Sequence, residues 1–494
     1  MKEKGTNFRR GVGVGVMGQN LKKVLASIHG TKSPDELATD YEIFPKSLLY
    51  RLCDTIGEKT GTVLLNPHIA TVGNCADDVY YGFLKARREG KKLVILWPYE
   101  LPGRLRFGLT NSEVINIGSE YRAFPHNSAI TVISRYVITG YFAFFRTLSI
   151  LRRIILGRHL NNVFRIPAMG EAALWCPAGV TEFSWEVVGQ YKWPEQWASP
   201  LDLSLEENKR LQAETQRKIL GLPSDAWFVC LHVRESGFRD SETYTEKDAY
   251  TERNANIINY IDAIREITSR GGWVVRMGDA SMTKLPSMDR VIDYPFTDSK
   301  SALMDVYLIS QCRVYIGMIS GIYNLAELFQ RPIITMNLNN WMVGYPPKKG
   351  DLAIFKRIFS KSRNRCLSIK EWIAEPWNAV SWCHKLGDDY LFLENTPDEL
   401  KAVVREFFDR AENSTRSSLQ MQFDDARIRR GIEIIGKQMF FADDVAPYYR
   451  KKVVDYDLVE RYRLASRLDS AVGMIGSEFL EQNWDFNQGG AGVA

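Results

Sequence analysis

Histidine and arginine side chains follow directly after apolar runs at two places in the middle of the chain. The run at 227–231 ends at His232 and Arg234. A shorter run that begins at Trp273 ends at Arg276. Uninterrupted apolar runs of this length predict strands that are buried on both faces. Because an arginine presents a planar fork of donors that matches phosphate oxygens, the pattern predicts a pair of arginines that bind a phosphate.

Small polar residues follow a third apolar run. Ser320 and Gly321 come shortly after the run at 314–317, and a stretch of helical periodicity comes next. The free N–H groups and the positive dipole end of such a helix favour a phosphate. The alternative is that Arg234 and Arg276 make ordinary salt bridges.

Three more residues occupy strand ends of the same kind. Gly278 and Asp279 follow Arg276, and Asn337 follows an apolar run at 333–336. We expect Asp279 and Asn337 to contact the base, ribose or sugar of a bound donor, and Gly278 and His232 to belong to the same donor site.

The elements that must position these side chains alternate in type. Strands are expected at 227–231, 273–277, 291–292, 313–317 and 333–336, and helices at 253–269, 303–311 and 323–329. Alternation with short connections predicts an α/β protein with a parallel, doubly wound sheet. In such sheets ligands bind beyond the carboxyl ends of the strands, where the predicted site residues lie.

A set of short motifs also carries a family resemblance. The motifs lie at 232–237, 253–254, 272–279, 292–294, 312–317, 320–321, 351–360 and 394–400. Together they resemble a little-characterised bacterial family of GT-B-type glycosyltransferases associated with surface glycans. The resemblance implies two Rossmann-like domains with parallel sheets that face a cleft, and transfer of a sugar. The His-Val-Arg element at 232–234 also resembles, more distantly, the His-x-Arg element of fucosyltransferases that use GDP-fucose.

A general base is expected in the first of these domains. An apolar run at 62–65 precedes His68, and the loop expected at 71–78 ends in Asp77 and Asp78. In a GT-B enzyme this loop faces the cleft, and an inverting transfer needs a base for the proton of the acceptor hydroxyl. These three residues are therefore candidates. The alternative is that one of the aspartates caps the following helix.

Other acidic and glycine-rich motifs compete with these candidates. Glu235 and Asp240 are rival bases from the second domain. The Gly-x-Gly-x-x-Gly match at 13–18 has no strand before it, so it does not indicate a dinucleotide site. The Asp-x-Asp match at 455–457 lies far from either strand set, and the histidines show no metal-ligand spacing. We expect no metal.

The region from 121 to 170 contains seven arginines and no aspartate or glutamate. Residues 134–158 within it are strongly apolar and predict a helix. Arg135, Arg146 and Arg153 fall on one stripe of this helix because their spacings are close to whole turns. The longest uncharged run is too short to span a bilayer. A helix of this kind favours peripheral contact with an anionic membrane; the alternative is a buried helix whose arginines meet internal acids.

Length and composition set the expected domain organisation of the 494 residues. We expect an N-terminal appendage at 1–59, a Rossmann-like acceptor domain at 60–200, a nucleotide-sugar domain at 201–405, and a helical extension with a disordered tail at 406–494. Residues 469–483 are expected to return to the first domain. The net charge of +5 does not indicate nucleic acid.

The cysteine pattern and the N-terminus predict the compartment. The seven cysteines are odd in number and show no Cys-x-x-Cys spacing, which indicates a reduced, cytosolic chain. The polar N-terminus, with no long apolar core after it, predicts no signal peptide. The protein is therefore expected in the cytoplasm, at the inner face of the cell membrane.

These patterns predict a metal-independent glycosyltransferase that moves a sugar from a nucleotide-sugar to a glycan or lipid-linked saccharide. No cofactor is expected, because the nucleotide-sugar is a substrate. One alternative is a nucleotide-sugar epimerase of the same fold, which would not need the basic apolar helix. Another is an inactive glycosyltransferase-like protein that acts as a membrane assembly partner, which would keep the helix and lose nucleotide binding.

Overall fold

The computed structural model describes the chain in blocks. The described residues are 55–65, 67, 71–97, 99, 111–124, 128–156, 173–174, 182–183, 200–235, 251–339, 348–375, 389–410, 415–437 and 473–486. Most of the predicted N-terminal appendage, the tail, His68 and Asp240 lie outside them.

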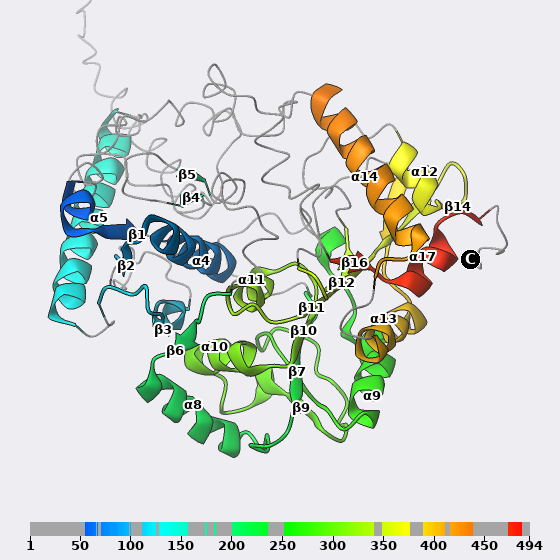
Figure 1. The fold of residues 1–494 in the computed structure, drawn as a ribbon, viewed down its shortest axis with the longest axis horizontal. Helices are drawn as coiled ribbons and strands as arrows, with labels where there is room; N and C mark the ends of the chain where they lie inside the picture. The colour runs from blue at the N-terminus through cyan, green and yellow to red at the C-terminus, as the bar shows by residue number, and fades with distance from the viewer. Residues whose placement is uncertain are drawn as a thin grey trace, which may run out of the picture.

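A seven-stranded sheet in which every neighbouring pair is parallel forms the larger part of the structure (Figure 1). Its order is β16-β12-β11-β10-β7-β8-β9. The strands are β7 (Phe228–His232), β8 (Trp273–Arg276), β9 (Val291–Asp293), β10 (Val314–Gly317), β11 (Ile333–Leu338), β12 (Leu352–Phe355) and β16 (Met474–Ile475). The direction of winding reverses between β7 and β10, as in doubly wound α/β folds. The predicted parallel, doubly wound sheet is confirmed.

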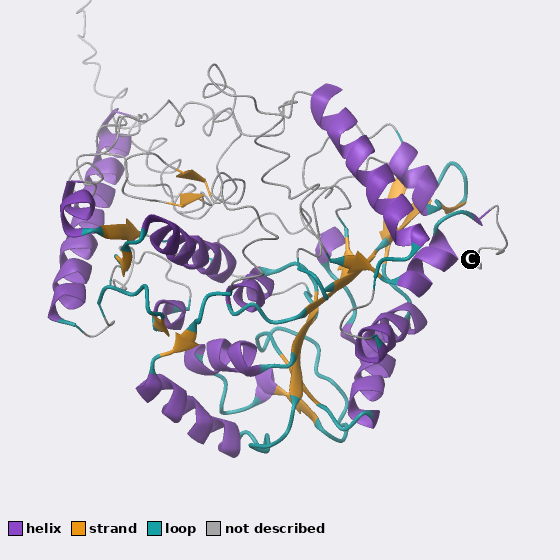
Figure 2. Cartoon of the chain, in the orientation of Figure 1, coloured by secondary structure: helices purple, strands orange, loops and turns teal. Residues whose placement is uncertain are grey.

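The sheet is buried on both faces, which explains the uninterrupted apolar runs of its strands. Along β7, Phe228 and Cys230 pack into one core cluster, while Val229 and Leu231 pack into another. Helices cover both faces (Figure 2). One layer holds α8 (Glu207–Ile219), α10 (Ala302–Gln311) and α11 (Gly321–Leu328), and the other holds α9 (Ile261–Ser269) and α13 (Pro397–Asp409).

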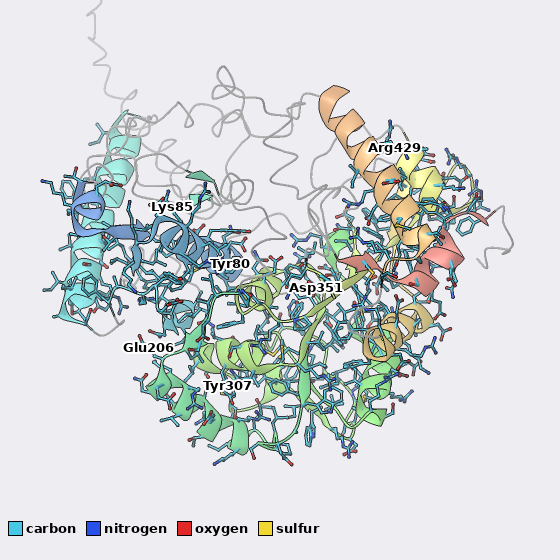
Figure 3. The ribbon with its side chains drawn as sticks, in the orientation of Figure 1. Tyr80, Lys85, Glu206, Tyr307, Asp351 and Arg429 are labelled. Atoms are coloured by element: carbon cyan, nitrogen blue, oxygen red, sulfur yellow. The ribbon has the colours of Figure 1, made fainter. Side chains whose placement is uncertain are left out.

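A smaller unit precedes the large sheet. Strands β1 (Thr62–Leu65) and β2 (Lys92–Ile95) are parallel and are joined by α4 (Val72–Glu89). The remaining elements here are η2 (Ser112–Ile115), β3 (Ile117–Gly118), α5 (Ala129–Leu156), β4 (Ala173–Leu174), β5 (Glu182–Phe183) and β6 (Ser204–Leu205). Its apolar core is continuous with the α10 and α11 side of the large sheet, where Figure 3 labels Tyr80 and Tyr307. A second complete Rossmann-like domain, and with it the GT-B arrangement, stays a prediction.

The C-terminal elements complete the large sheet instead of returning to the first unit. Strand β16 pairs with β12, and α17 (Ser477–Asn483) packs against α13. The expected return of 469–483 to the first domain is therefore wrong for its described part. Helix α13 also runs across the predicted boundary at 405. The other elements are η4 (Thr251–Arg253), η5 (Ile257–Tyr260), η6 (Tyr294–Phe296), β13 (Arg357–Ser360), β14 (Arg365–Cys366), α12 (Ile369–Ala374), β15 (Tyr390–Leu393) and α14 (Ser418–Lys437).

Candidate functional site

The reversal point of the sheet brings two predicted site residues together. His232 ends β7, and Ser320 precedes α11 after the neighbouring strand β10. The Nδ1 atom of His232 lies 3.2 Å from the Ser320 hydroxyl oxygen. Burial, helped by the positive charges of Arg276 and Arg234, lowers the pKa of His232 to about 3. The imidazole is therefore neutral at pH 7 and offers one donor and one acceptor nitrogen.

The N-terminus of α11 lies at the same point. Ser320 is its N-cap residue, but its side chain makes no hydrogen bond to the amides of the first turn. The first turn of α11 also carries no acidic residue. The positive end of the helix is thus uncompensated within its own first turn, which favours an anion at this position.

A basic cluster of Arg234, Arg253 and Lys356 surrounds Asn254 beside this helix end. Arg234 donates to the Asn254 side-chain oxygen, and Lys356 donates to the Asn254 carbonyl oxygen at 2.6 Å. Arg253 donates to the carbonyl oxygen of Ile319, next to Ser320, at 2.9 Å. Burial lowers the pKa of Lys356 to about 8. The charge of Arg234 also lowers this pKa, whereas the charges of Glu394 and Glu252 raise it. The lysine remains largely protonated at pH 7, so the cluster carries positive charge to the N-terminus of α11.

Lys356 was not among the predicted site residues, although its sequence pattern is the same as that of the others. It follows the buried apolar strand β12 directly, as Arg276 follows the apolar residues of its own strand. The run at 352–355 is short, and in the sequence it belongs only to one of the motifs that carry the family resemblance. A basic residue directly after a buried run is therefore a signal that points to Lys356, although the same signal also marks Arg276, which has internal partners.

Arg276 has a different environment from the one predicted. Its guanidinium is fully buried and lies 2.9 Å from an oxygen of Asp293 and 3.5 Å from one of Glu235. It also donates to the Thr283 carbonyl at 3.0 Å. The guanidinium thus has internal partners, as the salt-bridge alternative expects, and its contact with a phosphate stays a prediction. Glu235 accepts from the Thr283 amide at 2.7 Å and belongs to the same network, which anchors the chain after β8.

The other predicted strand-end residues also fall into two groups: some remain candidates for contact with a ligand, and others have internal partners. Asp279 is partly exposed and accepts a hydrogen bond from the Ser281 amide at 2.9 Å. Its negative charge acts to raise the pKa of His232, but burial and the charges of Arg276 and Arg234 lower that pKa by more. Gly278 has φ 141°, and a β-carbon there would overlap the Met282 side chain. Asp279 therefore stays a candidate for donor contact.

Asn337 lies in an internal network. It is buried, donates to the Tyr260 hydroxyl at 2.8 Å, and exchanges hydrogen bonds with Asn395. Its side chain joins the end of β11 to neighbouring elements, which differs from the predicted contact with a donor.

The first unit reaches the site through α4. Asp77 and Asp78 lie within this helix, whose N-cap is Thr71, so they are neither in a loop nor capping residues. An oxygen of Asp77 accepts from the Asn324 amide group on α11 at 2.7 Å. Asp78 is buried, with 1% of its surface exposed. Among the described candidates for the base, Asp77 is thus the carboxylate that the fold places beside α11.

Two glycines allow the N-termini of α4 and α11 to touch. A β-carbon added at Gly73 would lie 2.8 Å from the Gly321 Cα, and one added at Gly321 would lie 2.6 Å from a Val72 methyl carbon. Neither helix has an acid in its first turn. The contact therefore brings two positive helix ends to one place.

Replacing Gly73 by Ala is expected to lower the free energy of unfolding by about 1–3 kcal/mol, because the atom it meets is backbone and the helices must separate. Gly140→Ala on α5 is the matched control, since nothing lies within 4 Å of its added β-carbon. Removing a mid-helix glycine there should stabilise by about 0.5–1 kcal/mol. Chemical denaturation measures both; equal stability of Gly73→Ala and wild type would contradict close packing of α4 on α11.

A strongly perturbed carboxyl group lies at the other edge of the sheet. Burial raises the pKa of Asp351 to about 7. Asp351 precedes β12, however, and accepts from the amide of Ile333 at the start of β11 (Figure 3). It is therefore at the amino ends of the strands, away from the site, and holds neighbouring strands together.

Of the three predicted membrane arginines, the structure describes the side chain of Arg135 alone. Helix α5 is confirmed, but the Arg135 guanidinium is only partly exposed and lies 4.0 Å from the centre of the Tyr99 ring. Burial lowers the pKa of Arg135. The side chains of Arg146 and Arg153 lie outside the described part. In the described part of the chain, no helix is long and apolar enough to cross a bilayer.

The described residues contain no group of three or more His, Cys, Asp or Glu side chains arranged to hold a metal ion. Among them, Cys75, Cys230, Cys312 and Cys366 are free thiols.

The strand order and the site at its reversal point define an α/β protein with a Rossmann-like parallel sheet. No model of a known protein family matches the sequence, and no curated protein matches it. Among solved structures, a glycosyl transferase family 9 protein from Veillonella parvula DSM 2008 aligns with TM-score 0.32 and 12% identity, over 56% of this chain and 79% of that chain. A similarity this distant carries no conclusion about activity.

Proposed function

We propose that the protein is a glycosyltransferase that holds the diphosphate of a nucleotide-sugar at the N-terminus of α11. The supporting observation is the meeting of His232 and Ser320 at the reversal point of the sheet, with the basic cluster beside them. The uncompensated helix end and the charges of Arg234 and Lys356 suit a group with two or more negative charges.

The same groups suit the chemistry of transfer. In the reaction an acceptor hydroxyl oxygen forms a bond to the anomeric carbon, and the bond from that carbon to the diphosphate oxygen breaks. The electron pair leaves with the diphosphate, and fixed positive charge at its position lowers the barrier. The hydroxyl proton goes to a general base, for which Asp77 is the candidate. The acceptor class is a glycan or a lipid-linked saccharide.

A thermal-shift screen against UDP, GDP, CMP and dTDP tests this proposal. We expect at least one nucleotide to raise the melting temperature, since a ligand at 100 times its Kd stabilises the folded state by about 2.7 kcal/mol. Added EDTA should leave this rise in melting temperature unchanged if the protein's own basic side chains hold the diphosphate. An absence of any shift would favour the inactive assembly partner.

Arg234→Ala should weaken nucleotide binding by roughly 10- to 150-fold, because a hydrogen bond to a charged group contributes about 1.5–3 kcal/mol. Arg313→Ala is the matched control: Arg313 is an exposed arginine that precedes β10, at the opposite edge of the sheet, and lies over the Trp227 ring. Calorimetric titration measures both affinities. Equal affinities of Arg234→Ala and wild type would move the phosphate away from this site.

A further inference from the structure

Helix α5 presents an uncharged apolar stripe to solvent. The α5 stripe consists of Ile130, Ile133, Val137, Phe144, Leu151 and Ile155, each between 48% and 68% exposed. Spacings of three, four and seven residues place these side chains on one face of the helix. The stripe is about 38 Å long at the usual rise per residue. Apolar patches of this extent on a protein surface mark a contact with another apolar partner.

The other side of α5 attaches the helix to the first unit. The Thr139 hydroxyl oxygen accepts from the Tyr99 amide at 2.6 Å, and Arg135 stacks on the Tyr99 ring. Ile138 is buried in the core cluster of this unit. The helix lies at the outer edge of the molecule (cyan in Figure 1), and the exposed fractions of the stripe residues place the α5 stripe on the side away from this packing.

We propose that the α5 stripe rests on a lipid bilayer, with the helix in the plane of the membrane surface. The stripe has no charged residue, so it can enter the boundary between headgroups and acyl chains without burying a charge. The region 121–170 has seven arginines and no acid, so nothing in it repels anionic headgroups. The contacting face proposed here differs from the face that carries Arg135, which stacks on Tyr99.

A second copy of the chain is a poorer match to the stripe. Ile130, Val137 and Phe144 recur every seven residues, as in a coiled-coil seam. The second seam position of such a repeat would be occupied by Gly140 and Thr147 at the middle of the helix. A pair of helices would leave a gap at these two positions, whereas fluid lipid chains can fill such a gap.

Vesicle co-sedimentation of the full chain, without nucleotide, tests the inference independently of the proposed function. The vesicles are phosphatidylcholine with phosphatidylglycerol. The variant Ile133→Gln/Val137→Gln/Phe144→Gln keeps good helix formers at exposed positions. The partition coefficient of this variant between vesicles and buffer should fall roughly 100- to 1,000-fold, since each inserted side chain of this size raises the coefficient roughly tenfold.

The matched control is Leu211→Gln/Ile219→Gln/Met421→Gln, which removes three exposed apolar side chains elsewhere. It should bind like wild type, and wild-type binding should persist at high salt because the contact is apolar. Loss of binding in the control, or loss of wild-type binding at high salt, would overturn the inference. A wild-type dimer that ignores vesicles and becomes monomeric in the Ile133 triple variant would assign the stripe to a second copy instead.

Discussion

Replacing Asp77 by Asn is expected to lower the rate of sugar transfer by about 100- to 10,000-fold, the usual contribution of a general base. Nucleotide affinity should be unchanged, because Asp77 comes from the first unit and the basic cluster from the large sheet. The substitution keeps the shape of the side chain that faces Asn324. The measurement is the rate of nucleoside diphosphate release from the nucleotide-sugar, with binding followed by calorimetry.

Glu89→Gln is the matched control for this variant. Glu89 lies in the last turn of the same helix, is partly exposed and pairs with Lys85 and Lys91. Its loss removes one carboxylate from α4 at the end remote from α11, so transfer should continue at the wild-type rate. If Asp77→Asn also transfers at that rate, the base must be sought at His68, Glu235 or Asp240.

Replacing Arg276 by Ala is expected to lower the free energy of unfolding by about 3–5 kcal/mol, because the change leaves buried charge without its partner. Asp293 and Glu235 lie 2.9 and 3.5 Å from the guanidinium and would then face each other's charge in a poorly solvated place. The loss should appear as a lower midpoint in urea denaturation followed by circular dichroism.

Arg265→Ala gives the scale for this effect. Arg265 is exposed and pairs with Asp262 one turn away on α9, a type of pair that contributes at most about 1 kcal/mol. One outcome would instead support the predicted role of Arg276 in phosphate binding. If Arg276→Ala is as stable as wild type and loses nucleotide affinity, its guanidinium turns toward the ligand when the ligand binds.

The strands of the large sheet were predictable because a strand that is buried on both faces is apolar at nearly every position. The run at 228–231 is apolar at every position since alternate side chains enter two different cores. The position of His232 and Ser320 at one edge follows from strand direction alone, because parallel strands place their carboxyl ends together. Helix limits were less well predicted: α4 begins at Val72, several residues before the expected helix, since Val72 and Gly73 are ordered by contact with α11.

Which charged side chains face a ligand was decided by tertiary contacts. Arg234 and Arg276 have the same pattern in the sequence, yet Arg276 meets a carboxylate from the next strand, Asp293, and becomes internal. Arg135 was predicted to face a membrane, but it stacks on Tyr99, which comes from a loop after β2. The succession of buried strands along the chain and the edge where the site lies were predictable, because hydrophobic periodicity is a local property. The partner of each charged side chain could not be predicted, because it comes from a distant part of the chain that the fold brings close.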